Sequence, residues 1–133
     1  MPKPDPIALY IVVRESLDMG MGKACAQSGH AVEKIVDSFH ELAWRLPEMS
    51  GAEEEFGKFA LYREWKKNGS RKITLIANEK EWETLRAEYG KACHIVVDAG
   101  ITDLVPGTET MMAFWPQHKS ARSKSLKRLR SCE

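Results

Sequence analysis

A run of seven apolar residues, Ile7 to Val13, places the strongest constraint on how this chain can fold. The run is rich in β-branched residues and does not alternate apolar with polar positions, which is typical of a strand buried on both faces of a sheet. It is far shorter than the roughly 20 apolar residues that a membrane-spanning helix needs. It also has neither the basic lead nor the small-residue cleavage site of a secretory signal. We therefore expect a central strand over residues 8–14, with no membrane span and no secretion.

A long amphipathic helix is predicted after this strand. A turn containing Gly20 and Gly22 leads into it, and Pro47 ends it at about Leu46. At 100° per residue its apolar positions form one broad stripe, which predicts a core-facing surface. A separate polar stripe lies beside the apolar one and consists of Lys23, Gln27, His30 and Lys34. This polar stripe starts next to the glycine turn, so we expect a functional site there.

The remainder of the chain alternates helical and strand patterns, which favours an α/β sheet with helices on both faces. The patterns predict a helix over 56–67, a strand over 72–77, a helix over 79–89 capped by Asn78, and strands over 92–98 and 108–115. About ten residues without a helical pattern link the last two strands. We therefore expect one pair of strands in the sheet to be antiparallel.

The net charge of +1 hides an uneven distribution. Residues 1–116 contain 14 Lys and Arg against 18 Asp and Glu, whereas residues 117–133 contain six basic residues and one acid. A mildly acidic body therefore carries a basic end. Such a segment can contact phosphates or an acidic surface, and a solvated tail is an equally open reading.

The three cysteines, Cys25, Cys93 and Cys132, form no CxxC pair and are odd in number. That usage fits thiols in a reducing compartment, so we expect a cytoplasmic protein. Neither the cysteines nor the histidines have the spacing of metal ligands, and we expect no metal site.

Common catalytic and nucleotide-binding motifs do not fit. A P-loop fails because Leu17 stands where its first glycine belongs and Ala24 where its Ser or Thr belongs. The dinucleotide-binding fingerprint is weak, and the G-x-S-x-G elbow of serine hydrolases is absent. What remains is an anion site formed by the backbone N–H groups around Gly20 and Gly22 together with Lys23.

Asp98 ends the apolar strand predicted over 92–98, which places its carboxylate at the carboxyl edge of the sheet. Open α/β sheets bind ligands at that edge. If this strand runs parallel to the first one, Lys23 and Asp98 meet there, with the hydroxyls of Thr102 and Thr110 beside them. A loop-capping aspartate with two ordinary strand threonines is the alternative.

Three segments together resemble the peptidyl-tRNA hydrolase 2 family. They are YIVVR at 10–14, MGMGKACAQSGHA at 19–31 and VDAGITDLVPGTET at 97–110. The likeness extends from about Ala8 to Pro116, so we expect a family-like domain over 1–116 and a basic C-terminal tail over 117–133. The resemblance implies a three-layer α/β domain with a four-stranded mixed sheet and helices on both faces, assembled as a homodimer.

The resemblance also implies an activity, namely hydrolysis of the ester between a peptide and tRNA without a metal or any other cofactor. It assigns catalytic roles to Lys23, Asp98 and Thr102. The substrate-binding residues that it implies are Gly20, Gly22, Gln27, His30 and Thr110. From the residues alone, an ordinary solvated histidine on a helix explains His30 better than a ligand contact does.

The sequence departs from the family pattern at three positions near the expected site. Met21 replaces a lysine, Ile101 replaces an arginine and Asp103 replaces a glutamine. Two positive charges are thereby lost, and RNA affinity depends on such charges. Two alternatives follow: a non-catalytic RNA- or protein-binding member of the same fold, and a hydrolase that acts on a small ester or amide.

Overall fold

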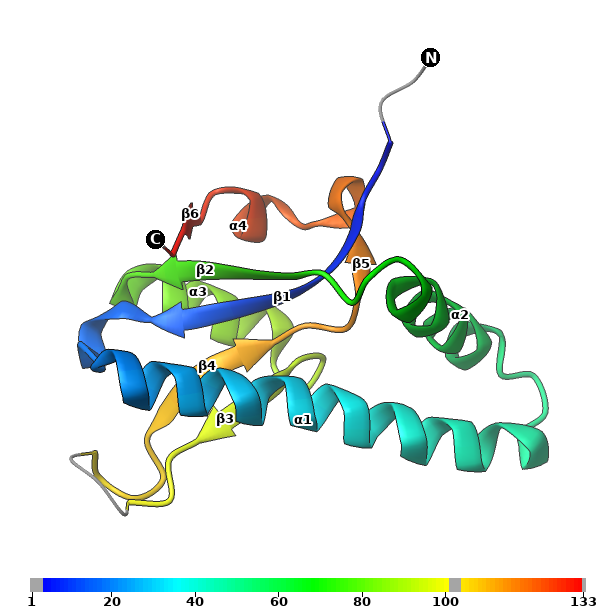
Figure 1. Ribbon diagram of the computed structural model, residues 1–133, viewed down its shortest axis with the longest axis horizontal. Helices are drawn as coiled ribbons and strands as arrows, with labels where there is room; N and C mark the ends of the chain where they lie inside the picture. Colours follow the sequence, from blue (N-terminus) through cyan, green and yellow to red (C-terminus); the bar gives the residue numbers. More distant parts are fainter. Residues whose placement is uncertain (1–3, 101–103, 133) are drawn as a thin grey trace.

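The computed structural model describes residues 4–100 and 104–132 (Figure 1). Its strands are β1 (Ile7–Arg14), β2 (Lys72–Ala77), β3 (His94–Val97), β4 (Glu109–Ala113), β5 (Gln117–His118) and β6 (Arg130–Ser131). Its α-helices are α1 (Met21–Arg45), α2 (Glu53–Lys67), α3 (Glu79–Tyr89) and α4 (Lys124–Lys127). Three short 3₁₀ turns complete the elements: η1 (Glu15–Leu17), η2 (Leu46–Glu48) and η3 (Lys119–Ala121).

The sheet is mixed and has six strands, in the order β3-β4-β1-β2-β6, with β5 paired to the start of β1. Strands β1 and β2 are parallel, and β4 is antiparallel to both β1 and β3. Consequently β1, β2 and β3 all point the same way and present their carboxyl ends at one edge. The expected antiparallel pair is confirmed as β3 and β4.

The expectation of four strands is wrong. The two additional strands, β5 and β6, contain two residues each. A strand is recognised in a sequence by repetition of its two-residue period, and two residues are too few to show it.

Strand β1 is the centre of the core, as its apolar run predicts. Its odd-numbered side chains, such as Leu9 and Ile11, pack in one apolar cluster with residues of α1 and α2. Its even-numbered side chains, such as Tyr10 and Val12, pack in a second cluster with residues of α3 and α4. Apolar side chains on both faces of one strand therefore hold helices on both faces of the sheet (Figure 1).

Residues 117–132 run back along the sheet and contribute to the second apolar cluster. The side chains of Leu126 and Leu129 are buried there, and β6 pairs with the outer side of β2. Five basic side chains of this segment are exposed: Lys119, Lys124, Lys127, Arg128 and Arg130. The segment thus combines apolar anchors with a basic surface.

The three cysteines are free thiols, of which Cys25 and Cys132 are exposed and Cys93 is buried. Within residues 4–100 and 104–132, no helix combines the length and the apolar character needed to cross a membrane.

Candidate active site

The start of α1 is placed at the carboxyl edge of the sheet by the chain that leaves β1. After η1 the backbone reverses through Asp18, whose φ of 47° is left-handed, and Gly20 then caps α1 in an extended conformation. A Cβ atom added at Gly20 or Gly22 would meet nothing within 4 Å. Packing therefore does not require glycine at these positions, and their missing side chains leave open space beside the first turn of α1.

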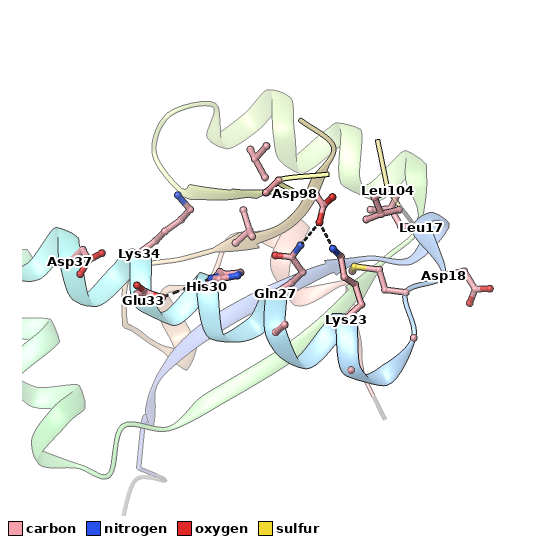
Figure 2. Close-up of a pocket in the computed structure, with 17 residues that line it drawn as sticks. Leu17, Asp18, Lys23, Gln27, His30, Glu33, Lys34, Asp37, Asp98 and Leu104 are labelled. Carbon is pink, nitrogen blue, oxygen red and sulfur yellow. Dashed lines mark hydrogen bonds and ion pairs between the residues drawn. The ribbon is translucent and has the colours of Figure 1, made fainter. Parts of the chain in front are cut away.

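Three donors converge on the carboxylate of Asp98, which directly follows β3 (Figure 2). Lys23 Nζ donates to Oδ1 in an ion pair, and Gln27 Nε2 donates to the same oxygen at 3.1 Å. The backbone N–H of Gly100 donates to Oδ2 at 2.8 Å. Lys23 and Gln27 reach one carboxylate because residues four apart share a face of a helix. The structure thus brings Lys23 and Asp98 together at one edge, as expected for a first and third strand that run in the same direction.

The Lys23 ammonium is the main reason why the pKa of Asp98 is lowered below its ordinary value. Burial of the carboxyl group opposes this effect, and the N–H groups of Gly100 and Gln27 lower the pKa further. Asp98 is therefore ionised at neutral pH. A buried carboxylate with three donors is fixed in place, and it fixes Lys23 in turn.

The side chain of Gln27 has one polar atom without a partner. The residue is only 3% exposed, and among the described residues no group donates to its Oε1. The amide cannot be turned around without losing an interaction, because Oε1 would then face the Asp98 carboxylate. A buried acceptor left unpaired costs about 1–3 kcal/mol. Gln27 Oε1 is therefore a buried acceptor without a partner among the described residues, next to the Asp98 carboxylate.

A cleft of about 880 Å³ surrounds this cluster and extends along α1 as far as Asp37. Its polar lining includes Lys23, Gln27, His30, Glu33, Lys34, Asp37 and Asp98. Its apolar lining includes Leu17, Met19, Val97 and Leu104. At 1.5 Å per residue, the part of α1 beside the cleft is roughly 25 Å long, which suits an extended ligand.

The other predicted site residues lie in different surroundings. His30 is exposed and lines the cleft, with Nδ1 3.9 Å from the Glu33 carboxylate. Thr110 is fully buried beside an irregularity in the β3–β4 pairing, and its hydroxyl donates to the Val96 carbonyl at 3.3 Å. It is not among the described residues that line the cleft. Thr102 lies outside the described residues, so its position is not assigned.

Sequence reasoning missed two groups of cleft residues. The acids Glu33 and Asp37 line the cleft beyond His30. Their sequence positions put them next to the polar stripe on the surface of α1, and this neighbourhood could have identified them. Leu17, Met19 and Leu104 line the opposite end, and isolated apolar residues in loops carry no comparable signal. Of the side chains that the structure describes, no group of three or more His, Cys, Asp or Glu is arranged to hold a metal ion.

Comparisons with known proteins agree on one family. The family described as Peptidyl-tRNA hydrolase PTH2 matches residues 7–132. A peptidyl-tRNA hydrolase of Methanocaldococcus jannaschii is 34% identical over 114 residues, which cover 82% of this chain and 85% of that protein. A peptidyl-tRNA hydrolase of Pyrobaculum aerophilum is 29% identical over 83% of this chain and 84% of its own length. The mitochondrial peptidyl-tRNA hydrolase 2 of Homo sapiens is 29% identical over 81% of this chain and 54% of its own length. This chain therefore belongs to the peptidyl-tRNA hydrolase PTH2 family.

Proposed function

We propose that this protein hydrolyses the ester bond between a peptide and the 3′ end of a tRNA, releasing both. Membership of the family supports this activity, since archaeal and human relatives carry the name peptidyl-tRNA hydrolase. The two alternatives, a non-catalytic binder and a hydrolase of small esters, are not favoured by these relatives. The observation that carries the proposal is the convergence of Lys23 and Gln27 on the buried Asp98 carboxylate inside an open cleft.

Lys23 is assigned to stabilisation of the transition state. When water attacks an ester, negative charge develops on the carbonyl oxygen, and a cation fixed in advance next to that oxygen lowers the barrier. The Lys23 side chain is 22% exposed while its ammonium is held by Asp98. The ammonium is thus both positioned and accessible from the cleft. Backbone N–H groups in the first turn of α1 add positive potential to the same place.

Asp98 is assigned to orientation of Lys23 and of the attacking water. Its lowered pKa makes it a weak base, so Asp98 does not hold the proton that the water loses during the reaction. The water supplies its hydroxyl to the acyl carbon, and its proton ends on the 3′ oxygen of the departing ribose. The products are a peptide with a free carboxyl group and a tRNA with a free 3′ hydroxyl.

Gln27 is assigned to substrate binding because it lines the cleft and its Oε1 has no partner among the described residues. Hydroxyl groups of the terminal ribose are donors of the kind that this atom needs. The family resemblance supports a catalytic role for Thr102 and substrate contacts for Gly20, Gly22 and His30. It implies a contact for Thr110 as well, but this buried side chain is not among the described residues of the cleft.

The activity is tested by single-turnover hydrolysis of an N-acetyl-aminoacyl-tRNA. We expect Lys23→Ala to lower the rate by about 10²–10³-fold, as loss of an oxyanion-stabilising donor does in other hydrolytic enzymes. Lys80→Ala is the matched control, because Lys80 is an exposed lysine on α3 outside the cleft. Absence of turnover in the folded wild-type protein would contradict the proposal.

Four finer features are part of the same proposal: a homodimer, a cytoplasmic location, a three-layer domain, and RNA contacts from the basic side chains of residues 117–132. The family resemblance supports the dimer, and the unpaired cysteines support a reducing compartment. Apolar clusters on both faces of the sheet support the layers. Light scattering checks the dimer, for which the expected mass is twice 15.1 kDa.

A further inference from the structure

The cleft has two unlike ends, one on each side of the Lys23–Asp98 pair. Leu17 and Leu104 lie together beyond the pair, next to the start of α1 (Figure 2). On the other side the cleft follows α1 past Gln27 and is lined by charged and polar side chains (Figure 2). An extended substrate whose ester bond lies at the pair must therefore place one part at an apolar end and the other at a polar end.

Near the apolar end, three arginines at the carboxyl edge of the sheet form ion pairs. Three carboxylate partners account for them: Arg14 pairs with Glu79 at 2.6 Å, Arg86 with Glu109 at 2.9 Å, and Arg130 with Glu15 at 3.4 Å. The cleft lining at this end also contains the carboxylate of Asp18. These ion pairs leave the three guanidinium groups less available to a phosphate.

The opposite end contains two acids, Glu33 and Asp37, and lysines that form no ion pair with them. No ion pair joins Lys34 or Lys58 to an acid in the part of the chain that the structure describes. Lys58 Nζ also lies 4.6 Å from the ring centroid of Trp115. Burial lowers the pKa of His94, and the charges of Lys58 and Lys34 lower it further, which places all three groups in one electrostatic neighbourhood. An anion bound among them would relieve their mutual repulsion.

We infer that the cleft binds its substrate in one direction. The side chain of the esterified amino acid lies at the apolar end, which is formed by Leu17, Met19 and Leu104. The 3′ strand of the tRNA runs along α1 toward Lys34 and Lys58. This inference rests on the proposed hydrolase function. It makes the apolar end a specificity pocket that favours peptidyl-tRNAs ending in a large apolar amino acid.

The opposite orientation, with the terminal adenine at the apolar end, fits the lining less well. Protein sites for unpaired bases usually stack them on aromatic rings or on arginine. Among the described lining residues the one ring is that of His30, which lies on the polar side of the pair.

The test compares N-acetyl-leucyl and N-acetyl-glycyl esters of one and the same tRNA in single-turnover reactions, with each rate divided by the spontaneous hydrolysis rate of that ester. We expect kcat/KM for the leucyl ester to exceed that for the glycyl ester by about tenfold or more, the discrimination that an apolar pocket provides. Leu17→Ala and Leu104→Ala should each bring this ratio closer to one. Both side chains are only partly buried, so the variants are expected to fold.

Two controls make the result specific. Leu104→Met keeps an apolar side chain of similar volume and should keep most of the preference. Trp44→Ala removes an apolar side chain that is 85% exposed on α1 outside the cleft, and should leave the ratio unchanged. Equal wild-type rates for both esters would overturn the inference while leaving the hydrolase function intact. Failure to hydrolyse either ester would instead count against the function itself.

Discussion

Asp98 is the residue around which the site is assembled, because its carboxylate binds side chains from α1 and the backbone that follows β3. Its two oxygens accept hydrogen bonds from Lys23, Gln27 and Gly100. A carboxylate with this many donors is stabilised in its charged form, which is why its pKa is lowered. The same contacts hold the Lys23 ammonium at the cleft without neutralising it by proton transfer.

The lowered pKa predicts how the contribution of Asp98 to stability depends on pH. In the unfolded chain an aspartate titrates near 3.9, above the folded value here. The contribution of Asp98 to stability is therefore fully present at pH values above its pKa in the unfolded chain. It is lost as the pH falls through the pKa of Asp98 in the folded protein. We expect the difference in free energy of unfolding between wild type and Asp98→Asn to be constant from pH 6 to 8 and to shrink in acid below about pH 4.

Urea unfolding of both proteins at pH 7 and pH 3 measures this difference. A difference that is larger at pH 3 would mean that the folded pKa of Asp98 is raised, contrary to the hydrogen bonds described. The dependence of kcat/KM on pH provides a second check. Because the pKa of Asp98 is lowered, protonation of Asp98 should cause no loss of activity between pH 5 and 7.

Helix α1 serves both the core and the site, on two neighbouring stripes of its surface. Ala31, Ile35 and Phe39 pack against the sheet, whereas Lys23 and Gln27 reach the edge of the sheet at Asp98. The glycine in its first turn is not explained by packing, since glycine weakens a helix by about 1 kcal/mol relative to alanine. Open space for the substrate is the explanation that the cleft supports.

Gly22→Ala is therefore predicted to separate stability from activity. The added Cβ meets nothing within 4 Å, so the free energy of unfolding should rise by about 0.5–1 kcal/mol. Because Gly22 lines the cleft, kcat/KM should fall. Gly29→Ala is the matched control: this glycine lies in the same helix with equally open space but outside the cleft lining, so stability should rise without loss of activity. Unchanged activity in Gly22→Ala would exclude Gly22 from substrate contact.

Elements with a full periodic pattern were predictable from the sequence. The strand at β1, the end of the helix at α1 and the N-cap at Asn78 agree with the structure within about a residue, and Asn78 forms a capping box with Glu81. Helix α1 begins at Met21, inside the predicted glycine turn. Helix α2 begins at Glu53 rather than at residue 56, because its first turn is acidic and carries no apolar signal. Short pairings such as β5 and β6 depend on tertiary contacts, which leave no local pattern.

The site was predictable to the extent that strand direction determines it. Once β1 and β3 run the same way, a lysine after one and an aspartate after the other reach the same edge. The surroundings of Thr110 were not predictable, because the pairing of β3 with β4 is irregular beside it and its hydroxyl is bonded to Val96. A local change in strand pairing alters which face a side chain occupies, and no residue pattern reveals it.

At the scale of the whole molecule, the two ends of the cleft differ in how their cations are paired. Arg14, Arg86 and Arg130 form ion pairs at the carboxyl edge of the sheet, whereas Lys34 and Lys58 form none among the described residues, although Glu33 and Asp37 also line the far end. Because RNA binding releases counterions for each neutralised phosphate, lysines that contact a tRNA are identified by the salt dependence of binding.

The double variant Lys34→Gln/Lys58→Gln tests that arrangement. We expect weaker tRNA binding and a slope of log Kd against log salt that is reduced by about one for each lysine that contacts a phosphate. Lys80→Gln, on the exposed surface of α3, is the control and should change neither quantity. An unaltered salt slope in the double variant would show that the RNA does not follow α1 to these lysines.

The central claim is that Lys23 and Asp98 act as one catalytic unit on a peptidyl-tRNA ester. Single-turnover hydrolysis by wild type, Lys23→Ala, Asp98→Asn and the double variant tests it most directly, with thermal unfolding used to verify that each protein is folded. Since Lys23 and Asp98 act together in the same step, each single variant should lose about 10²–10³-fold and the double variant no more than the worse single one. Full turnover in either folded single variant, or losses that multiply in the double variant, would contradict the account.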